Sequence, residues 1–174
     1  MSKRTGSDQK RGWFIGWDVG GWNCDKNQNS RDAIVILDAN HEIVGAPWRG
    51  NLRECINSCS TSIEWIAALF DLRGSGVSPE SGPVILAIDT PLGFSEAYPS
   101  ACKRSETIQA LRQPYPVLSH ADCEDALTCA LVASLFAEKR GALKPPEADV
   151  SPSEGWIWVP RDAFAQDAAS PDCT

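Results

Sequence analysis

The sequence lacks any run near the roughly 18 consecutive apolar residues of a membrane-spanning helix, which excludes a spanning protein and a membrane partner. Its polar residues 1–12 also lack the apolar core of a secretory signal. Basic residues are scarce, since 16 Lys and Arg oppose 23 Asp and Glu and leave a net charge of −7 at pH 7. Because non-specific duplex binders usually carry a basic surface, this charge argues against broad binding to nucleic acid.

A complete disulfide framework is not expected either. The seven cysteines are an odd number, and no secretory signal accompanies them. Reduced thiols in a cytoplasmic protein are therefore the expectation. No second Cys or His pair stands at zinc spacing beside Cys55 and Cys59, so these two residues are expected to pack within a helix.

What the chain does have is globular composition. Over 174 residues, 43% are hydrophobic and 22% are charged, which suits one domain with a buried core. We expect residues 1–11 to form a disordered arm, residues 12–160 to form a single domain, and residues 161–174 to form a loose tail.

Short apolar runs predict the strands of one sheet. Three of them, residues 13–19, 33–37 and 42–48, follow one another with polar connections and favour an antiparallel meander. A fourth run, residues 84–88, is apolar throughout, as in a strand that is covered on both faces.

Apolar residues at helical spacing predict three helices. The first covers residues 52–70, with Asn51 as its N-cap and Glu54 completing a capping box. A short helix is expected at residues 105–112 and a long one at residues 121–140. The predicted fold class is therefore α/β, with a three-stranded antiparallel meander and a parallel strand in one mixed sheet, flanked by helices.

Three aspartates lie in apolar surroundings, where a carboxylate is costly to bury unless it is paired, capped or bound to a metal. Asp18 lies in the first predicted strand, Asp89 ends the fourth, and Asp125 follows Asp122 near the start of the long helix. Turn and capping roles are the structural alternatives for each of them. Brought together, these carboxylates would repel one another, which implies a protonated member or a bound divalent cation.

Four segments of the chain carry a family resemblance. They are residues 15–20, 87–94, 125–133 and 154–160. In this order they resemble the domain of unknown function 429 family, whose members are predicted nucleases with a ribonuclease H-like fold.

The resemblance implies a ribonuclease H-like domain with Mg²⁺ or Mn²⁺ as cofactor. It implies Asp18, Asp89 and Asp125 as catalytic metal ligands, and Asp122 is a candidate for a fourth, more distant ligand. Two such ions can activate water and stabilise the leaving oxygen of a phosphodiester. The leading expectation is therefore a metal-dependent nuclease.

One stretch departs from the family pattern. In the family, a longer stretch with a fifth strand separates the Asp-Thr-Pro-Leu-Gly segment from the one that resembles residues 96–100, whereas here the two are almost fused. We therefore expect residues 95–119 to contain no full central strand. The sheet would then have an open edge beside residues 84–88, or an edge that a second copy of the chain fills in a homodimer.

The partner of such a site would be a nucleic acid or a nucleotide. Candidates for contact with it are Lys103, Arg104, Arg112 and Trp22. A solvated face and core packing are the alternatives for these residues.

Two other functions stay open. Residues 18–21, Asp-Val-Gly-Gly, also resemble the first phosphate-binding turn of actin-like and sugar-kinase-like ATPases. The chain can also be a non-catalytic interaction module that has kept the fold.

Overall fold

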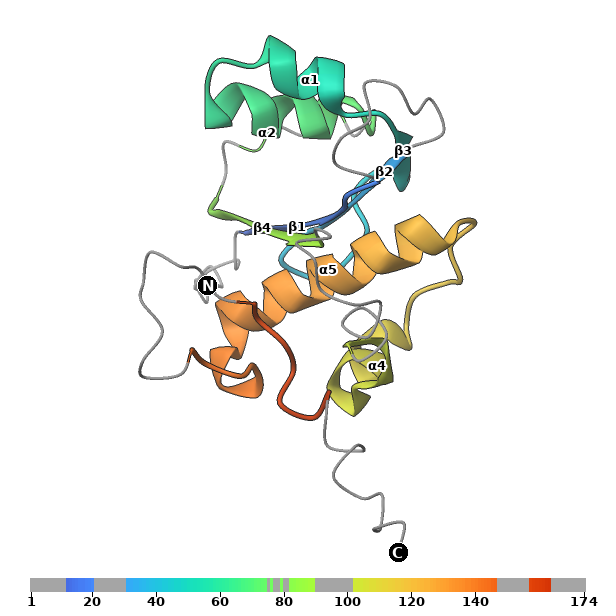
Figure 1. Cartoon of the computed structure of the whole chain (residues 1–174), viewed down its shortest axis with the longest axis vertical. Helices are drawn as coiled ribbons and strands as arrows, with labels where there is room; N and C mark the ends of the chain where they lie inside the picture. The colour runs from blue at the N-terminus through green and yellow to red at the C-terminus, as the bar shows by residue number, and fades with distance from the viewer. Residues whose placement is uncertain are drawn as a thin grey trace, which may run out of the picture.

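The computed structural model describes residues 12–20, 31–74, 76, 79, 82–89, 102–146 and 157–163. The predicted arm at residues 1–11 and Trp22 lie outside this part of the chain. The described residues form a mixed sheet with helices on both faces (Figure 1).

The sheet has four strands in the order β3-β2-β1-β4. β1 (Trp13–Asp18) pairs antiparallel with β2 (Asp32–Leu37), which pairs antiparallel with β3 (Trp48–Gly50). β4 (Val84–Asp89) pairs parallel with β1. The predicted α/β class, with three antiparallel strands and one parallel strand, is confirmed.

The third strand was predicted at residues 42–48 and lies later in the chain. Ile43 makes only an isolated bridge to β2. Gly45 takes a φ of 66°, which bends the chain where a strand would have to continue. The Val44 carbonyl accepts from the guanidinium of Arg73 at 2.5 and 3.0 Å. The buried Arg73 thus binds the backbone of this connection and joins it to the helical layer above.

β4 is an edge strand within the described residues, where it pairs with β1 alone. Residues 102–119 contain no strand, in agreement with the expectation for this stretch, while residues 90–101 lie outside the described part. A homodimer through this edge stays a prediction.

The single helix predicted over residues 52–70 is two helices, α1 (Arg53–Ser58) and α2 (Ser62–Asp71). A second N-terminus interrupts it, because the Thr61 hydroxyl accepts from the Glu64 amide while the Glu64 carboxylate accepts from the Thr61 amide. This capping box satisfies two backbone donors that would otherwise lack partners.

The capping box predicted at the start of the first helix is wrong. The N-cap of α1 is Leu52, which offers no side-chain hydrogen bond. The Asn51 side chain accepts instead from the Arg53 amide at 2.9 Å. The residue pattern for a capping box thus occurs twice, and only the Thr61 copy forms one.

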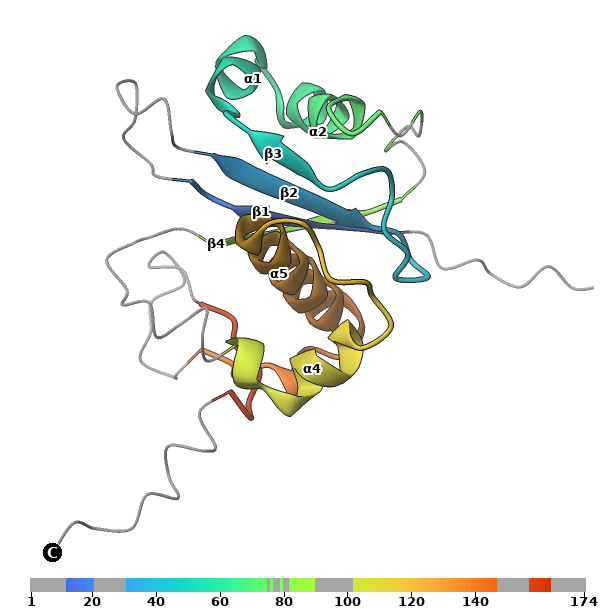
Figure 2. The same cartoon turned by 90° about the vertical axis from the view of Figure 1, so that its right-hand side faces the viewer.

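Alternating side chains divide the core into two layers, one on each face of the sheet (Figure 2). Ile15 and Trp17 of β1 face α1 and α2, where they pack in a cluster with Leu69 and Phe70. Phe14 lies on the opposite face, in the cluster under α5 (Ala121–Glu138).

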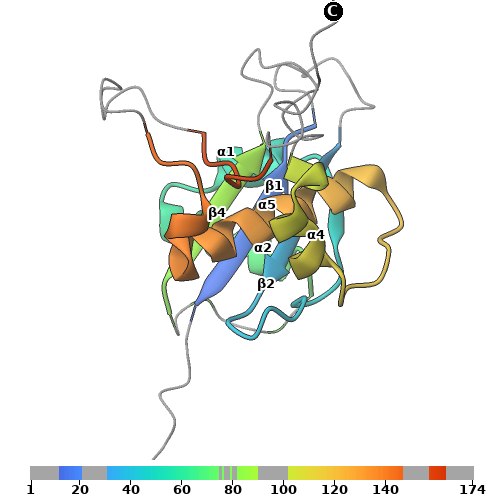
Figure 3. The same cartoon turned by 90° about the horizontal axis from the view of Figure 1, so that it is seen from below.

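The second face carries α5 against the sheet, with α4 (Glu106–Arg112) outside it (Figure 3). The helix predicted at residues 121–140 ends at Glu138, and a 3₁₀ turn, η2 (Arg140–Ala142), follows. Among the described helices, none is both long and apolar enough to cross a membrane.

The last described segment, residues 157–163, closes the α5 side of the fold, and we call it the C-terminal clasp. The sequence predicts a short strand or a docking segment at residues 156–159. Within the described residues the strand pairing of the clasp is one isolated bridge between Leu143 and Pro160, which favours the docking segment. The clasp also forms hydrogen bonds with the 3₁₀ turn that follows α5 and with the start of α4. Arg161 donates its backbone N–H to the Ala142 carbonyl at 3.0 Å, beyond the predicted end of the domain at residue 160.

Candidate functional site

Asp18 and Asp89 end two neighbouring parallel strands and lie opposite each other in the register. The Val19 amide donates to the Asp89 carbonyl at 3.1 Å, so the strand ends stay paired. Phe14 of β1 and Ala87 of β4 lie in the cluster under α5. Since every second residue of a strand shares a face, the Asp18 and Asp89 carboxylates face α5 as well.

Asp125 reaches the same place because α5 approaches β1 closely. A Cβ at Gly16 would lie 1.8 Å from the Ala126 carbonyl oxygen and 2.4 Å from the Ala130 nitrogen. Only a glycine leaves room for the helix backbone there. Asp125 precedes Ala126, so the same approach carries its carboxylate toward the strand ends. The three predicted aspartates therefore lie on one face of the sheet and within electrostatic reach of one another.

The pKa of Asp18 is raised to about 7 from 3.8. Burial is the largest cause, and the charges of Asp125, Asp89, Asp122 and Asp32 follow. The carboxyl group of Asp18 therefore titrates close to neutral pH in the metal-free chain. A bound cation would reverse this effect by favouring the ionised form.

The pKa of Asp89 is also raised. Burial comes first and the charge of Asp125 second, while the positive charge of Lys103 lowers it. Burial and the Asp125 carboxylate thus oppose the ionisation of Asp89 more strongly than the Lys103 ammonium favours it.

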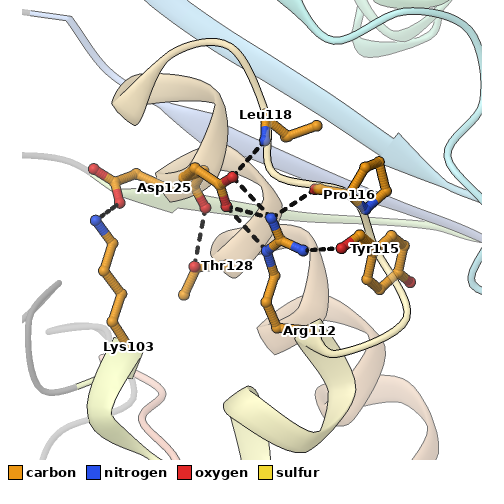
Figure 4. Close-up of polar contacts among 8 residues, drawn as sticks. Lys103, Arg112, Tyr115, Pro116, Leu118, Asp125 and Thr128 are labelled. Atoms are coloured by element: carbon orange, nitrogen blue, oxygen red, sulfur yellow. Dashed lines mark hydrogen bonds and ion pairs between the residues drawn. The ribbon is translucent and has the colours of Figure 1, made fainter.

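Two basic residues are bonded to carboxylates of this cluster. Lys103 forms an ion pair with Asp125, and Figure 4 shows its side chain extending to that carboxylate. Arg49 of β3 holds Asp122 at 2.5 Å between Nε and Oδ2. Asp122 is therefore tied to the β3 side of the helix, although its charge still acts on Asp18.

Arg112, a predicted substrate contact, is engaged within the fold. Its guanidinium donates to both carboxylate oxygens of Glu124 at 2.8–2.9 Å. It also donates to the carbonyls of Tyr115 and Pro116 (Figure 4). These contacts join α4 to the start of α5, so a structural role accounts for this side chain. Arg104 is exposed to solvent.

Asp32 is a structural carboxylate that sequence reasoning missed. Its Oδ1 accepts from the Trp17 indole at 3.1 Å and from the Gly20 amide at 3.3 Å, and its Oδ2 accepts from the Leu52 amide at 2.9 Å. It therefore fixes the chain beyond Asp18. The available signal was an aspartate beside an apolar run, although Asp32 begins its strand whereas Asp18 and Asp89 end theirs.

Cys129 is a second residue whose position beside the aspartates the sequence did not indicate. It lies one helical turn after Asp125. Burial raises the pKa of its thiol well above 9.0, and the charges of Asp89 and Asp18 add to that effect. Cys129 is thus a neutral, uncharged neighbour of the carboxylates.

The donor chemistry fits Mg²⁺ or Mn²⁺, which prefer carboxylate oxygens. In the conformation described, no three His, Cys, Asp or Glu side chains of the described residues lie close enough together to hold one ion. The ion pair between Lys103 and Asp125 supplies positive charge to the cluster instead. Ion binding therefore requires the side chains to move, while the strands and α5 already hold them on one face.

No protein-family model, curated protein or solved structure matches the chain. Any function is therefore argued from the residues and their arrangement.

Proposed function

We propose that this chain is a divalent-metal-dependent nuclease with a ribonuclease H-like fold, related to the domain of unknown function 429 family. Asp18, Asp89 and Asp125 would hold Mg²⁺ or Mn²⁺ and take part in the hydrolysis of a phosphodiester bond in a nucleic acid or nucleotide. The observation that carries the proposal is the pair Asp18 and Asp89, in register at the ends of parallel strands under the helix that carries Asp125.

The charge distribution supports a cation at this point more than a structural role for each aspartate. Capping and turn roles place a carboxylate beside backbone donors, as Asp32 does with its three donors. Asp18 and Asp89 instead have raised pKa values, so their surroundings oppose ionisation. Perturbed carboxyl groups of this kind concentrate at functional sites.

The residues would divide the work. Asp18 and Asp89 would supply ligands from the sheet, and Asp125 would add a ligand from the helix. The metal would supply activation of water and stabilisation of the leaving oxygen. The ammonium of Lys103 lies beside the cluster and can meet a phosphate, and the exposed Arg104 follows it in the chain.

The ATPase alternative depends on Gly20 and Gly21 as a phosphate-binding turn. A Cβ at Gly20 would lie 1.8 Å from the Arg31 carbonyl oxygen, so packing against the chain already requires a glycine there. Gly21 lies outside the described residues. The close packing of Gly20 against Arg31 accounts for this glycine without a phosphate-binding role, which favours the nuclease over the ATPase.

The test is a thermal melt with and without millimolar Mg²⁺ or Mn²⁺, beside a cleavage assay on single-stranded and duplex DNA and RNA. Metal is expected to stabilise the wild type, by about 2.7 kcal/mol at a hundredfold excess over the dissociation constant. Asp18→Asn and Asp89→Asn keep the shape and remove one charge each. Both are expected to lose metal stabilisation and cleavage while metal-free stability holds or rises.

Asp71→Asn is the matched control, because Asp71 is an exposed carboxylate at the end of α2 on the opposite face of the sheet. It should respond to metal as the wild type does. A wild-type melt that is indifferent to metal, with no cleavage of any substrate, would overturn the proposal. ATP binding without cleavage would then favour the ATPase, and the absence of both would favour the interaction module.

A further inference from the structure

We propose that Lys103 is a built-in counter-ion of the aspartate cluster, and that a divalent metal binds by displacing its ammonium group from Asp125. This inference rests on the function proposed above and adds to it a residue that sets the metal affinity of the site.

The contact itself is directed into the cluster. Lys103 pairs with Asp125, whose side chain is 22% exposed, and Figure 4 shows the two groups reaching toward each other. The charge of Lys103 also acts on Asp89, the neighbouring strand carboxylate. A single ammonium group thus offsets two of the three proposed ligands.

The backbone around Lys103 is anchored, while its side chain is 43% exposed. Cys102 on one side is 3% exposed, and Ser105 on the other is fully buried. Ser105 donates its hydroxyl to Asp162 of the C-terminal clasp at 2.6 Å, and Thr107 donates its amide to the same carboxylate at 2.9 Å. The clasp therefore fixes the segment from which Lys103 reaches the cluster.

The Lys103 ammonium and a divalent cation would compete for the same carboxylate. With Lys103 in place, part of the repulsion among the aspartates is already relieved, so metal gains less on binding. Removing the charge of Lys103 should raise metal affinity and lower the stability of the metal-free chain. Removing the charge of a neighbouring exposed base should do neither.

The experiment measures Mn²⁺ binding to the full chain by calorimetric titration, after treatment with a chelator. Lys103→Gln removes the charge, Lys103→Arg keeps it, and Arg104→Gln is the matched control with the same change in net charge. Lys103→Gln is expected to bind Mn²⁺ about tenfold more tightly than Arg104→Gln. Lys103→Arg is expected to stay near the wild type. Melts without metal should show Lys103→Gln below Arg104→Gln.

The outcomes separate this inference from the proposed function. Displacement is supported if Lys103→Gln binds Mn²⁺ more tightly than the wild type and the other variants do. It is also supported if Mn²⁺ binding is detected for Lys103→Gln and for none of the others. Equal Mn²⁺ affinities of Lys103→Gln and Arg104→Gln overturn the inference and leave the metal site standing. If neither the wild type nor any variant binds Mn²⁺, the proposed function fails and the inference fails with it.

Discussion

Asp18 lies within electrostatic reach of four other carboxylates, and its own burial adds to the free energy needed to ionise it. Three of those carboxylates have bonded partners of their own, since Arg49 holds Asp122, Lys103 pairs with Asp125 and three donors hold Asp32. Asp18 has the most strongly raised pKa of the cluster's aspartates. In the metal-free chain a proton can relieve this strain, which ties the stability of the fold to pH.

Asp18→Asn is expected to change that pH dependence. The pKa of Asp18 is about 7 in the folded chain against an ordinary value of 3.8, so between these values the folded state holds a proton that the unfolded state releases. The free energy of unfolding of the wild type therefore falls as pH rises through this window, and Asp18→Asn removes that part of the slope. The expected difference is on the order of 1–2 kcal/mol, since the site is partly solvated.

Urea unfolding with a chelator at about pH 5 and about pH 8 measures this difference. Asp71→Asn, with its exposed carboxylate on the other face of the sheet, should keep the wild-type slope. Parallel pH profiles for the wild type and Asp18→Asn would contradict the assignment of the raised pKa to Asp18.

The sequence predicted Asp18, Asp89 and Asp125 because an aspartate in an apolar run is conspicuous in one dimension. It did not predict that Lys103 pairs with Asp125. Lys103 precedes α4 and Asp125 lies in α5, so their contact depends on how these parts of the chain pack. The hydrogen bonds between Arg112 and Glu124 were not predicted for the same reason. Side chains that come together only in the tertiary structure cannot be paired from the spacing of residues in the sequence.

At the scale of elements, the contact between β1 and α5 positions the site. Gly16 is a point of close approach, and Asp125 directly precedes Ala126, one of the two helix residues that a Cβ at Gly16 would meet. α5 is buried over much of its length, so it cannot shift along the sheet without disturbing the core. The geometry of the aspartates is therefore a consequence of one missing side chain.

Gly16→Ala is expected to destabilise the chain by about 3 kcal/mol or more, because its Cβ would meet helix backbone rather than a side chain that can turn away. The matched control is Gly141→Ala, whose Cβ would have no atom within 4 Å. Chemical denaturation of the two variants beside the wild type gives both values. Equal stability of Gly16→Ala and Gly141→Ala would show that the helix does not approach the strand as described.

The strand sequence supported prediction better than the helix and loop sequence did. Apolar runs gave β1, β2 and β4 within a residue or so at each end. Burial on both faces accounts for the composition of β1 and β2. The cover on both faces that was expected for β4 is not observed among the described residues, because its side chains are half-buried or exposed. The break between α1 and α2 depends on one threonine hydroxyl at residue 61, and the shift of β3 depends on where Arg73 donates its hydrogen bonds. Single polar contacts thus decide where these helices and strands begin and end, and the periodicity of apolar residues does not reveal such contacts.

Across the whole molecule, the C-terminal clasp joins parts of the chain that lie far apart in sequence. Trp158 packs against Phe136 with ring centroids 4.9 Å apart, and Arg161 bonds to the carbonyls of the 3₁₀ turn. Asp162 accepts from Ser105 and Thr107 at the start of α4. The clasp thus connects the end of α5 to the beginning of α4.

Asp162→Ala is expected to lower the free energy of unfolding by about 1 kcal/mol, because it removes the acceptor for the first turn of α4. Burial alone would raise the pKa of Asp162, but hydrogen bonds from Ser105 and Thr107 hold it below 3.8. A carboxylate with a lowered pKa stabilises the fold above its unfolded pKa and stops doing so as pH falls through its folded pKa. The deficit of Asp162→Ala should therefore shrink in strong acid.

Denaturation of Asp162→Ala at neutral pH and at about pH 3 tests both statements. Asp71→Asn again serves as the control for the loss of a surface charge. A variant as stable as the wild type at neutral pH would show that the clasp does not support α4.

Among the described residues β4 is an edge strand, and its attachment is expected to set the lifetime of the aspartate cluster. β1 and β2 are buried along their middles, whereas the residues of β4 are half-buried or exposed throughout. Strands with less burial open by local fluctuation at a lower free energy than the whole domain. Asp89 leaves with β4 in such an event while Asp18 and Asp125 remain on the closed core. The fraction of molecules in which the three aspartates lie together is therefore expected to depend on the attachment of one strand, and a group that pairs with the outer edge of β4 would raise that fraction.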